Sequence, residues 1–255
     1  LLADHGIQEL LLIAQDTTDY GHDLGLKDGL AQLLEAILSE VPELPWIRIL
    51  YAYPGYVTDR LIDVMAANPR VLPYLDMPLQ HASVSVLRAM HRPANMDWVY
   101  ATIAKMRSRL PGLALRTTFI VGYPGETEHD FQTLLDFIQE IKFDHLGAFT
   151  FSFEEGTTSA PLGDPVPQEV KDERLHRLMM LQENISLGIN QTFIGKTLPV
   201  LIEGHQKNLS IGRSYRDAPE IDGLVLVDGK LPLGEIVNVQ VTGAMVHDLT
   251  AHLLT

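Results

Sequence analysis

One stretch decides the fold of this chain: Leu115-Arg116-Thr117-Thr118-Phe119-Ile120-Val121-Gly122-Tyr123-Pro124-Gly125-Glu126-Thr127. Its first half has the composition of a β-strand, and the glycine and proline residues that follow end the run. Thr127-Glu128-His129-Asp130 has the form of a capping box, which predicts a helix that begins at Thr127. A strand, a tight turn and a helix are therefore expected, the arrangement at which many α/β folds bind ligands. Apolar residues continue at helical spacing at Phe131, Leu134, Leu135, Ile138 and Ile141.

The same alternation of strand and helix patterns extends as far as residue 151. It predicts a parallel sheet with right-handed crossovers, either open or curled into a barrel. Polar or turn residues follow every expected strand, and since parallel strands end at one edge, these residues predict one shared pocket. They begin at Gln15, Tyr53, Gln80, Gly122 and Glu154. Expected strands are Gln8–Ala14, Ile47–Tyr51, Leu72–Met77, Ala114–Val121 and Leu146–Phe151, and expected helices are Lys27–Glu40, Asp59–Asn68, Ser83–Met90, Met96–Arg109 and Glu128–Lys142.

The chain changes character after a proline-rich segment at residues 161–167. A long helix is expected from Gln168 to about Phe193, because leucine and methionine recur on one stripe. Short β-like runs follow Gly195 and predict a small antiparallel barrel or roll of the oligonucleotide-binding kind. We therefore expect an α/β domain with a linking helix at residues 1–194 and an all-β domain at residues 195–255.

The charge of the chain argues against a general nucleic-acid binder. Asp and Glu number 33 and Lys and Arg number 19, which gives a formal charge of −14. Five basic and seven acidic residues give residues 195–255 a charge of −2. Phosphate contacts need clustered lysine and arginine, so a basic partner fits the chain better.

Several classes of site are excluded or disfavoured. The chain has no cysteine, so disulfides, thiolate nucleophiles and cysteine-bound metal sites cannot form within these residues. The histidines show neither His-x-His nor His-Glu-x-x-His spacing, which disfavours a mononuclear metal site. The apolar runs are far shorter than the ~18 residues that a membrane helix needs. We expect a cytoplasmic protein that does not associate with a membrane.

The turn after the expected strand and the positions of the lysines argue against two classes of enzyme, phosphate-binding barrel enzymes and Schiff-base aldolases. Glu126 and Glu128 would repel a phosphate at the expected helix start, whereas a ribose hydroxyl or an ammonium group would be favoured. His81, beside a strand end, is expected to be a loop residue bonded to the backbone rather than a catalytic one. A Schiff-base aldolase needs a lysine at a strand end, and every lysine before residue 195 lies in or beside an expected helix: Lys27, Lys105, Lys142 and Lys171.

Arg116 is the strongest candidate for a binding residue from pattern alone. Strand alternation places it with Thr118 on one face of the expected strand, where an unpaired charge would be costly. It either forms an ion pair with Asp76 or Asp16, or holds the carboxylate of a ligand. Gln15, Asp16 and Gln80 either grip the amine and hydroxyl groups of a ligand or cap neighbouring helices. The residues alone leave these alternatives open.

Four motifs resemble the radical S-adenosylmethionine (SAM) methylthiotransferases. They are Gln15-Asp16-Thr17, Pro78-Leu79-Gln80-His81-Ala82-Ser83, the stretch from Arg116 to Thr127, and Gly212-Arg213-Ser214-Tyr215-Arg216-Asp217-Ala218-Pro219-Glu220-Ile221-Asp222-Gly223. The last motif resembles the branch that modifies an aspartate of ribosomal protein S-twelve. The resemblance implies a partial (β/α) barrel with two 4Fe-4S clusters, followed by a TRAM domain.

The resemblance also implies specific roles for residues of this chain. The pocket for the cofactor S-adenosylmethionine would be lined by Gln15, Asp16, Gln80, Ser83, Arg116 and Thr118. The TRAM domain would hold the basic ribosomal protein with Arg213, Tyr215, Asp217, Glu220 and Asp222.

The chain departs from the family pattern in lacking every cluster cysteine and the first barrel strand with its loop. A truncated chain without metal ligands or catalytic residues of its own, inactive alone and monomeric, is therefore expected. The alternatives are a tRNA methylthiotransferase of the same superfamily and a non-catalytic module that binds RNA or a ribosomal protein.

Overall fold

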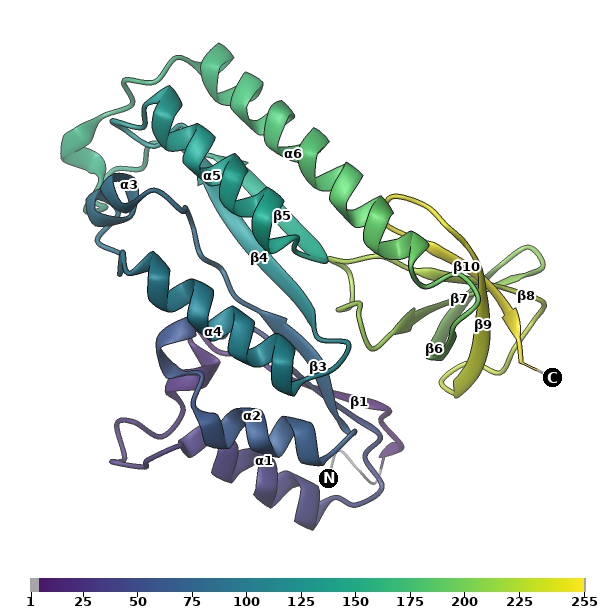
Figure 1. The fold of residues 1–255 in the computed structure, drawn as a ribbon. Helices are drawn as coiled ribbons and strands as arrows, with labels where there is room; N and C mark the ends of the chain where they lie inside the picture. The colour runs from purple at the N-terminus through teal and green to yellow at the C-terminus, as the bar shows by residue number, and fades with distance from the viewer. Residues whose placement is uncertain (1–4, 255) are drawn as a thin grey trace.

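A computed structural model describes residues 5–254, as a parallel sheet, a long helix and a small closed barrel (Figure 1). The first sheet has five strands in the order β1-β2-β3-β4-β5, and every neighbouring pair is parallel. This confirms the α/β sheet expected from the alternating pattern. The strands are β1 (Glu9–Leu12), β2 (Trp46–Ile49), β3 (Val71–Asp76), β4 (Ala114–Val121) and β5 (His145–Thr150).

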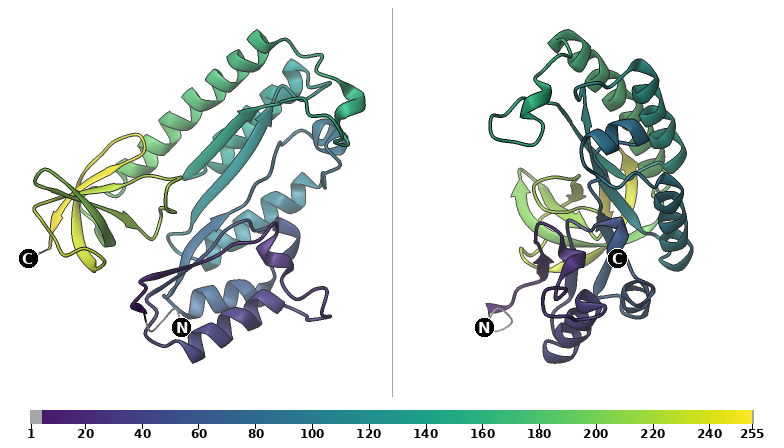
Figure 2. Two further views of the ribbon diagram at one scale, coloured as in Figure 1. Left: turned by 180° about the vertical axis from the view of Figure 1, so that it is seen from behind. Right: turned by 90° about the vertical axis from the view of Figure 1, so that its left-hand side faces the viewer.

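The helices between these strands gather on one side of the sheet, as the right-hand view of Figure 2 shows. Three short 3-10 turns, η2 (Thr17–Asp19), η3 (Pro54–Tyr56) and η4 (Ala160–Leu162), lie in the loops that follow β1, β2 and β5. Within residues 5–254, no helix has the length and apolar character needed to cross a membrane. The helices are α1 (Gly29–Glu40), α2 (Asp59–Ala67), α3 (Val84–Ala89), α4 (Met96–Arg109) and α5 (Glu128–Ile141).

Strand β4 shows how side-chain alternation produces the two faces of the sheet. Leu115, Phe119 and Val121 are fully buried and belong to the same apolar core as Phe131 and Leu134 of α5. The residues between them face the other way, because successive side chains of a strand point to opposite faces. These half-buried residues are Arg116, Thr118 and Ile120.

The second domain is a closed barrel with the strand order β10-β8-β7-β6-β9. The expected small barrel is confirmed, but the expectation that it is wholly antiparallel is wrong, because β10 pairs with β8 in parallel. The 24-residue helix α6 (Gln168–Gln191) connects the sheet to this barrel. The barrel strands are β6 (Thr197–Gln206), β7 (Leu209–Ser214), β8 (Val225–Asp228), β9 (Ile236–Ala244) and β10 (Leu249–Leu253).

Buried ion pairs join the two domains. Glu9 of β1 accepts a hydrogen bond from Arg48 Nε at 2.6 Å and another from Arg213 Nη2 of β7 at 2.6 Å. The side chains of Glu9, Arg48 and Arg213 are 4 %, 0 % and 4 % exposed. Arg48 also donates to the carbonyl of Tyr215 at 2.8 Å. Because these charges have no access to water, each depends on the others for its solvation.

Candidate active site

The turn after β4 is held by hydrogen bonds between its backbone and the side chain of Glu126. The carboxylate of Glu126 accepts hydrogen bonds from the N–H groups of Gly122 at 2.7 Å and Tyr123 at 3.2 Å. Its other oxygen accepts from Arg174 Nη1 of α6 at 2.9 Å. Glu128 is exposed and pairs with Arg177. The interpretation that Glu126 helps to favour a ribose hydroxyl or an ammonium group at the helix start is therefore wrong, since Glu126 is buried and its carboxylate is bonded to the turn itself.

The helix after this turn begins as the capping box predicts. Thr127 is the N-cap of α5, and its hydroxyl and the Asp130 carboxylate each bond to the backbone N–H of the other residue. The hydroxyl groups of Ser83 and Ser85 also donate to Asp130. Ser83 consequently lines a separate hollow beside α5, and it is not brought together with the other predicted cofactor residues.

We expect Asp130→Asn to destabilise the chain by about 1–2 kcal/mol at neutral pH. Burial tends to raise the pKa of Asp130, but hydrogen bonds from Ser83, Ser85 and Thr127 outweigh it and lower the pKa well below 3.8. A carboxyl group whose pKa is lower in the folded chain stabilises the fold above its unfolded pKa, and the contribution disappears as the pH falls further. Urea unfolding should therefore separate the two proteins at neutral pH, and the difference should shrink progressively as the pH falls below 3.8. A difference that stays constant in acid would contradict this assignment.

A long cleft lies where the strands of the sheet end. It consists of two adjoining hollows of about 410 and 480 Å³, which share Gln80, Arg92, Thr118 and Phe149. Residues that follow all five strands line the combined cleft, as the shared-pocket interpretation predicts. In chain order these residues include Asp16, Tyr53, Gln80, Tyr123 and Glu154.

Arg116 lies in this cleft with two carboxylate partners. Its Nη1 is 2.9 Å from Asp76 Oδ1, and its Nε is 3.3 Å from Asp222 Oδ1 of the second domain. The predicted ion pair with Asp76 is thus present, whereas Asp16 is not a partner. Burial lowers the pKa of Arg116, but the two carboxylates raise it above its ordinary value, so the guanidinium stays charged. Burial in turn raises the pKa of Asp76, against the attraction of Arg116. A cofactor contact by Arg116 stays a prediction.

Four more of the predicted cofactor residues line the cleft around Arg116. Gln15 and Asp16 lie at its β1 side. Asp16 is also the N-cap of η2, and its carboxylate accepts hydrogen bonds from the N–H and the hydroxyl of Thr18. Gln80 has a positive φ of 69° and bridges to β4 through its backbone, with its N–H donating to Thr118 at 2.9 Å. The structure therefore brings together Gln15, Asp16, Gln80, Arg116 and Thr118.

The predicted substrate residues of the second domain lie mostly at the junction with the sheet. Asp222 accepts from the hydroxyl of Tyr74 at 2.6 Å, and Tyr215 donates its hydroxyl to the carbonyl of Gly112 at 3.0 Å. Arg213 is held by Glu9, as described above. The polar groups of Asp222, Tyr215 and Arg213 thus already have partners within the chain. A role of these residues in substrate binding stays a prediction.

Asp217 and Glu220 differ in exposure. Asp217 is buried, and its carboxylate accepts from the hydroxyl of Ser214 at 2.6 Å and lies 3.6 Å from His145. Burial raises the pKa of Asp217. Glu220 is exposed on the same loop, where Ile221 reaches the cleft with 50 % of its surface accessible. Of the five predicted substrate residues, Glu220 is therefore the one that presents its side chain to solvent.

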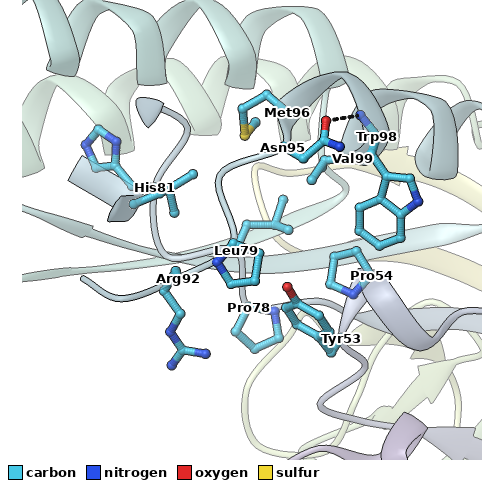
Figure 3. A pocket seen from close by; sticks show the side chains of 12 residues that line it. Tyr53, Pro54, Pro78, Leu79, His81, Arg92, Asn95, Met96, Trp98 and Val99 are labelled. Carbon is cyan, nitrogen blue, oxygen red and sulfur yellow. Dashed lines mark hydrogen bonds between the residues drawn. The ribbon is translucent and has the colours of Figure 1, made fainter. Parts of the chain in front are cut away.

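A smaller apolar pocket of about 40 Å³ adjoins the cleft (Figure 3). It shares Tyr53, Pro78 and Arg92 with the larger hollow and is otherwise lined by residues such as Met96 and Trp98. His81 borders this pocket and is buried. Its Nδ1 accepts the N–H of Ser83 at 2.9 Å, so the prediction of a backbone-bonded loop histidine is confirmed. Among residues 5–254, no group of three or more metal-binding side chains is arranged to hold an ion.

Sequence reasoning assigned no role to several residues that line the cleft, among them Tyr53, Arg92, Phe149 and Ile221. Tyr53 and Ile221 stand in segments that were singled out, a strand end and the last motif, but neither was assigned a role. Phe149 lies inside β5 with 62 % of its surface exposed, and only the alternation of that strand could have indicated it. Arg92 follows α3 in a loop, where no sequence signal marks it.

Comparison with known proteins agrees with this architecture. The sequence model of the radical SAM superfamily matches residues 1–138, and that of the TRAM domain matches residues 194–254. The chain therefore belongs to the radical SAM superfamily. Coproporphyrinogen III oxidase (HemN) from Escherichia coli, described as a radical SAM enzyme, has a related fold, with a TM-score of 0.51 at 18 % identity over 64 % of this chain and 38 % of that one.

More similar sequences bear the name "Ribosomal protein uS12 methylthiotransferase RimO". The protein from Chloroflexus aurantiacus is 50 % identical over 255 residues, covering 98 % of this chain and 56 % of the relative. The protein from Heliobacterium modesticaldum is 52 % identical over 250 residues, covering 97 % and 54 %. The one from Roseiflexus sp. is 47 % identical over 258 residues, covering 99 % and 55 %. The chain thus spans about half the length of these relatives.

Proposed function

We propose that this chain is the cofactor-binding and substrate-binding part of a methylthiotransferase that modifies ribosomal protein uS12. The observation that carries the proposal is the match, over nearly the whole chain, to relatives with that name. In this proposal the methylthio group is added to the β-carbon of a uS12 aspartate, and the protein acts as a cytoplasmic monomer.

The cleft has the donor groups and apolar surfaces that S-adenosylmethionine requires. Ile120, Tyr123 and Phe151 offer an apolar and aromatic wall for an adenine ring. The amide of Gln80 and the hydroxyl of Thr118 lie where the two hollows meet, and they can bond to ribose hydroxyls. When bound, S-adenosylmethionine would supply the adenosyl group from which radical chemistry in this superfamily begins.

An iron–sulfur cluster does not fit the residues of this chain. Cluster iron is held chiefly by cysteine thiolates, and the sequence contains no cysteine. The part of the reaction assigned to this chain is therefore binding and orientation, with no electron transfer through its own side chains.

We expect the chain alone to form no 5′-deoxyadenosine from S-adenosylmethionine. After anaerobic treatment with iron and sulfide, the chain and dithionite should leave the cofactor intact, as measured by liquid chromatography. The full-length Heliobacterium relative, treated in the same way, is the positive control. Production of 5′-deoxyadenosine by the chain at a comparable rate would show that its residues do support a cluster.

The charge of the TRAM domain favours a basic protein over RNA as its partner. Arg213 and Arg216 are buried, and each is paired with a carboxylate, Arg213 with Glu203 and Arg216 with Asp144. The basic side chains that remain exposed in this domain, within the described residues, are Lys196, Lys207 and Lys230. Three scattered lysines supply little of the clustered charge that RNA binding requires.

Titration of the chain with purified uS12 and with tRNA distinguishes the candidate substrates. We expect uS12 to bind and the complex to weaken as salt rises from about 0.05 to 0.5 M, because acidic and basic surfaces attract less when screened. Preferential binding of tRNA would instead favour the tRNA-modifying branch. Binding of uS12 without any binding of S-adenosylmethionine would favour a non-catalytic module.

A further inference from the structure

Two exposed side chains with large apolar surfaces, one from each domain, line the larger hollow of the cleft. Tyr51 follows β2, and Ile221 lies in the loop between β7 and β8. Neither of them lines the smaller hollow. The exposed fractions of Tyr51 and Ile221 are 43 % and 50 %. Apolar surfaces that stay exposed around one opening are typical of a site that binds a partner.

The backbone of Tyr51 is held in a conformation that bulky residues rarely adopt. Its φ of 55° lies in the left-handed region. The carbonyl of Tyr51 accepts the N–H of Thr17 at 2.9 Å. The next residue, Ala52, donates its N–H to the carbonyl of Asp76 at 2.7 Å. Unfavourable backbone geometry that the surrounding structure maintains is concentrated at functional sites, so the fold keeps Tyr51 at the hollow for a purpose other than packing.

The loop that carries Ile221 is anchored in a similar way. The carboxylate of Asp222 accepts hydrogen bonds from the N–H of Ala218 at 2.9 Å and from the hydroxyl of Tyr74 at 2.6 Å. On the other side of Ile221, Glu220 has a φ of 69°. The loop is thus closed on itself by Asp222 and attached to β3 through Tyr74. Ile221 is therefore presented to the hollow from a fixed support.

Glu220 adds a negative charge beside this apolar surface. Its side chain is exposed, and within residues 5–254 its carboxylate has no ion-pair or hydrogen-bond partner. Asp16 lines the same hollow from the β1 side. The formal charge of the whole chain is −14, so a basic partner is attracted from a distance as well. A carboxylate next to an apolar side chain fits a peptide segment in which a basic residue lies near an apolar one.

We propose that Tyr51 and Ile221 hold the uS12 segment that contains the modified aspartate, while Glu220 pairs with a basic residue of that segment. The inference rests on the proposed function, in which the aspartate approaches a nucleoside bound where the two hollows meet. Consecutive Cα atoms are about 3.8 Å apart, so the residues on either side of the aspartate then lie within reach of the larger hollow. Tyr51 and Ile221 line that hollow and not the one assigned to the adenine ring, so they select the peptide without holding the nucleoside.

The experiment measures the binding of purified uS12 and of S-adenosylmethionine by calorimetry. Ile221→Ser and Tyr51→Asn remove the apolar surfaces, and asparagine is chosen at residue 51 because it tolerates a positive φ. Leu233→Ser and Tyr56→Asn are the matched controls, since Leu233 and Tyr56 are 58 % and 44 % exposed and line neither hollow. We expect Ile221→Ser and Tyr51→Asn each to weaken uS12 about tenfold and the controls to leave it unchanged. All four variants should bind S-adenosylmethionine like the unchanged chain.

Two further variants test the apolar contact and the charge separately. Ile221→Met keeps an apolar side chain of similar volume, so it should bind uS12 within about twofold of the unchanged chain. Glu220→Gln should make the affinity for uS12 less sensitive to salt. Glu235→Gln removes the same charge from another exposed position of the domain and should leave the salt dependence as it is.

Binding of uS12 by Ile221→Ser and Tyr51→Asn as tight as by their controls would overturn the inference. An equal loss of affinity for S-adenosylmethionine in these two variants would also overturn it, because both side chains would then belong to the cofactor site. Failure of the unchanged chain to bind uS12 would instead overturn the proposed function on which the inference rests.

Discussion

Glu9→Gln is expected to lower the free energy of unfolding by about 3–5 kcal/mol, since it leaves two buried arginines without their shared carboxylate. Arg48 is 0 % exposed and Arg213 is 4 % exposed, and Glu9 accepts a 2.6 Å hydrogen bond from each. Arg213 keeps Glu203 as a partner, whereas Arg48 keeps no other carboxylate and has only backbone carbonyls and the ring of Tyr74. Arg48 is therefore the charge whose solvation suffers most. Urea unfolding monitored by circular dichroism measures the loss.

Glu35→Gln is the matched control for this substitution. Glu35 also pairs with an arginine, Arg60, but the two side chains are 46 % and 44 % exposed. Exposed pairs contribute little, so the control should leave the free energy of unfolding almost unchanged. In addition, Glu9→Gln should make the link between α6 and β6 more sensitive to protease, because the TRAM domain would dock less firmly. A loss as small as that of the control would contradict the buried network as the joint between the domains.

Gly122→Ala is expected to cost about 2–5 kcal/mol and to disturb the turn between β4 and α5. Gly122 has a φ of +74°, which an L-residue adopts at a cost of about 1–2 kcal/mol. An added Cβ would also overlap the side chain of Lys171, and overpacking adds about 1–3 kcal/mol. Lys171 cannot move aside cheaply, because it is buried and its ammonium is held by Asp164 and the carbonyl of Phe151.

Gly125→Ala separates the two contributions within the same turn. Gly125 also has a positive φ, +87°, but an added Cβ would have no atom within 4 Å. Its substitution should therefore cost only the conformational term of about 1–2 kcal/mol. Thermal and urea unfolding of both variants measure the difference. Equal losses at the two positions would show that packing against Lys171 contributes nothing.

The local signals predicted the elements well because each depends on neighbouring residues. The strand Ala114–Val121 is found at the expected residues, and the capping box at Thr127 and Asp130 starts α5 where predicted. Alternation also identified the face of β4 that carries Arg116 and Thr118. Such features follow from the chain's own periodicity and hydrogen-bonding preferences, which are visible within a few residues.

Contacts between distant segments could not be predicted in the same way. The orientation of Glu126 depends on Arg174, 48 residues later, and the parallel pairing of β8 with β10 depends on how the barrel closes. Asp222 reaches Arg116 only because the second domain docks against the sheet. No short-range pattern encodes these partners.

The location of the candidate site was predictable from the sequence, but the identity of several of its residues was not. Strand ends identified Gln15, Asp16 and Gln80, since the edge of a parallel sheet collects such residues. Ser83 was assigned to the site by resemblance, but its hydroxyl bonds to Asp130 on another face. Arg92 could be placed at the site only from the structure, because it follows α3 in a loop that the fold brings to the cleft.

A crystal structure of the chain with S-adenosylmethionine tests most directly whether the cleft at the strand ends binds the cofactor. We predict that the nucleoside lies where the two hollows meet, against Gln80, Thr118 and Ile120, the residues that line this junction and the wall beside it. A nucleoside bound instead in the hollow beside Ser83, in the pocket beside Trp98, or in neither of these places would contradict it.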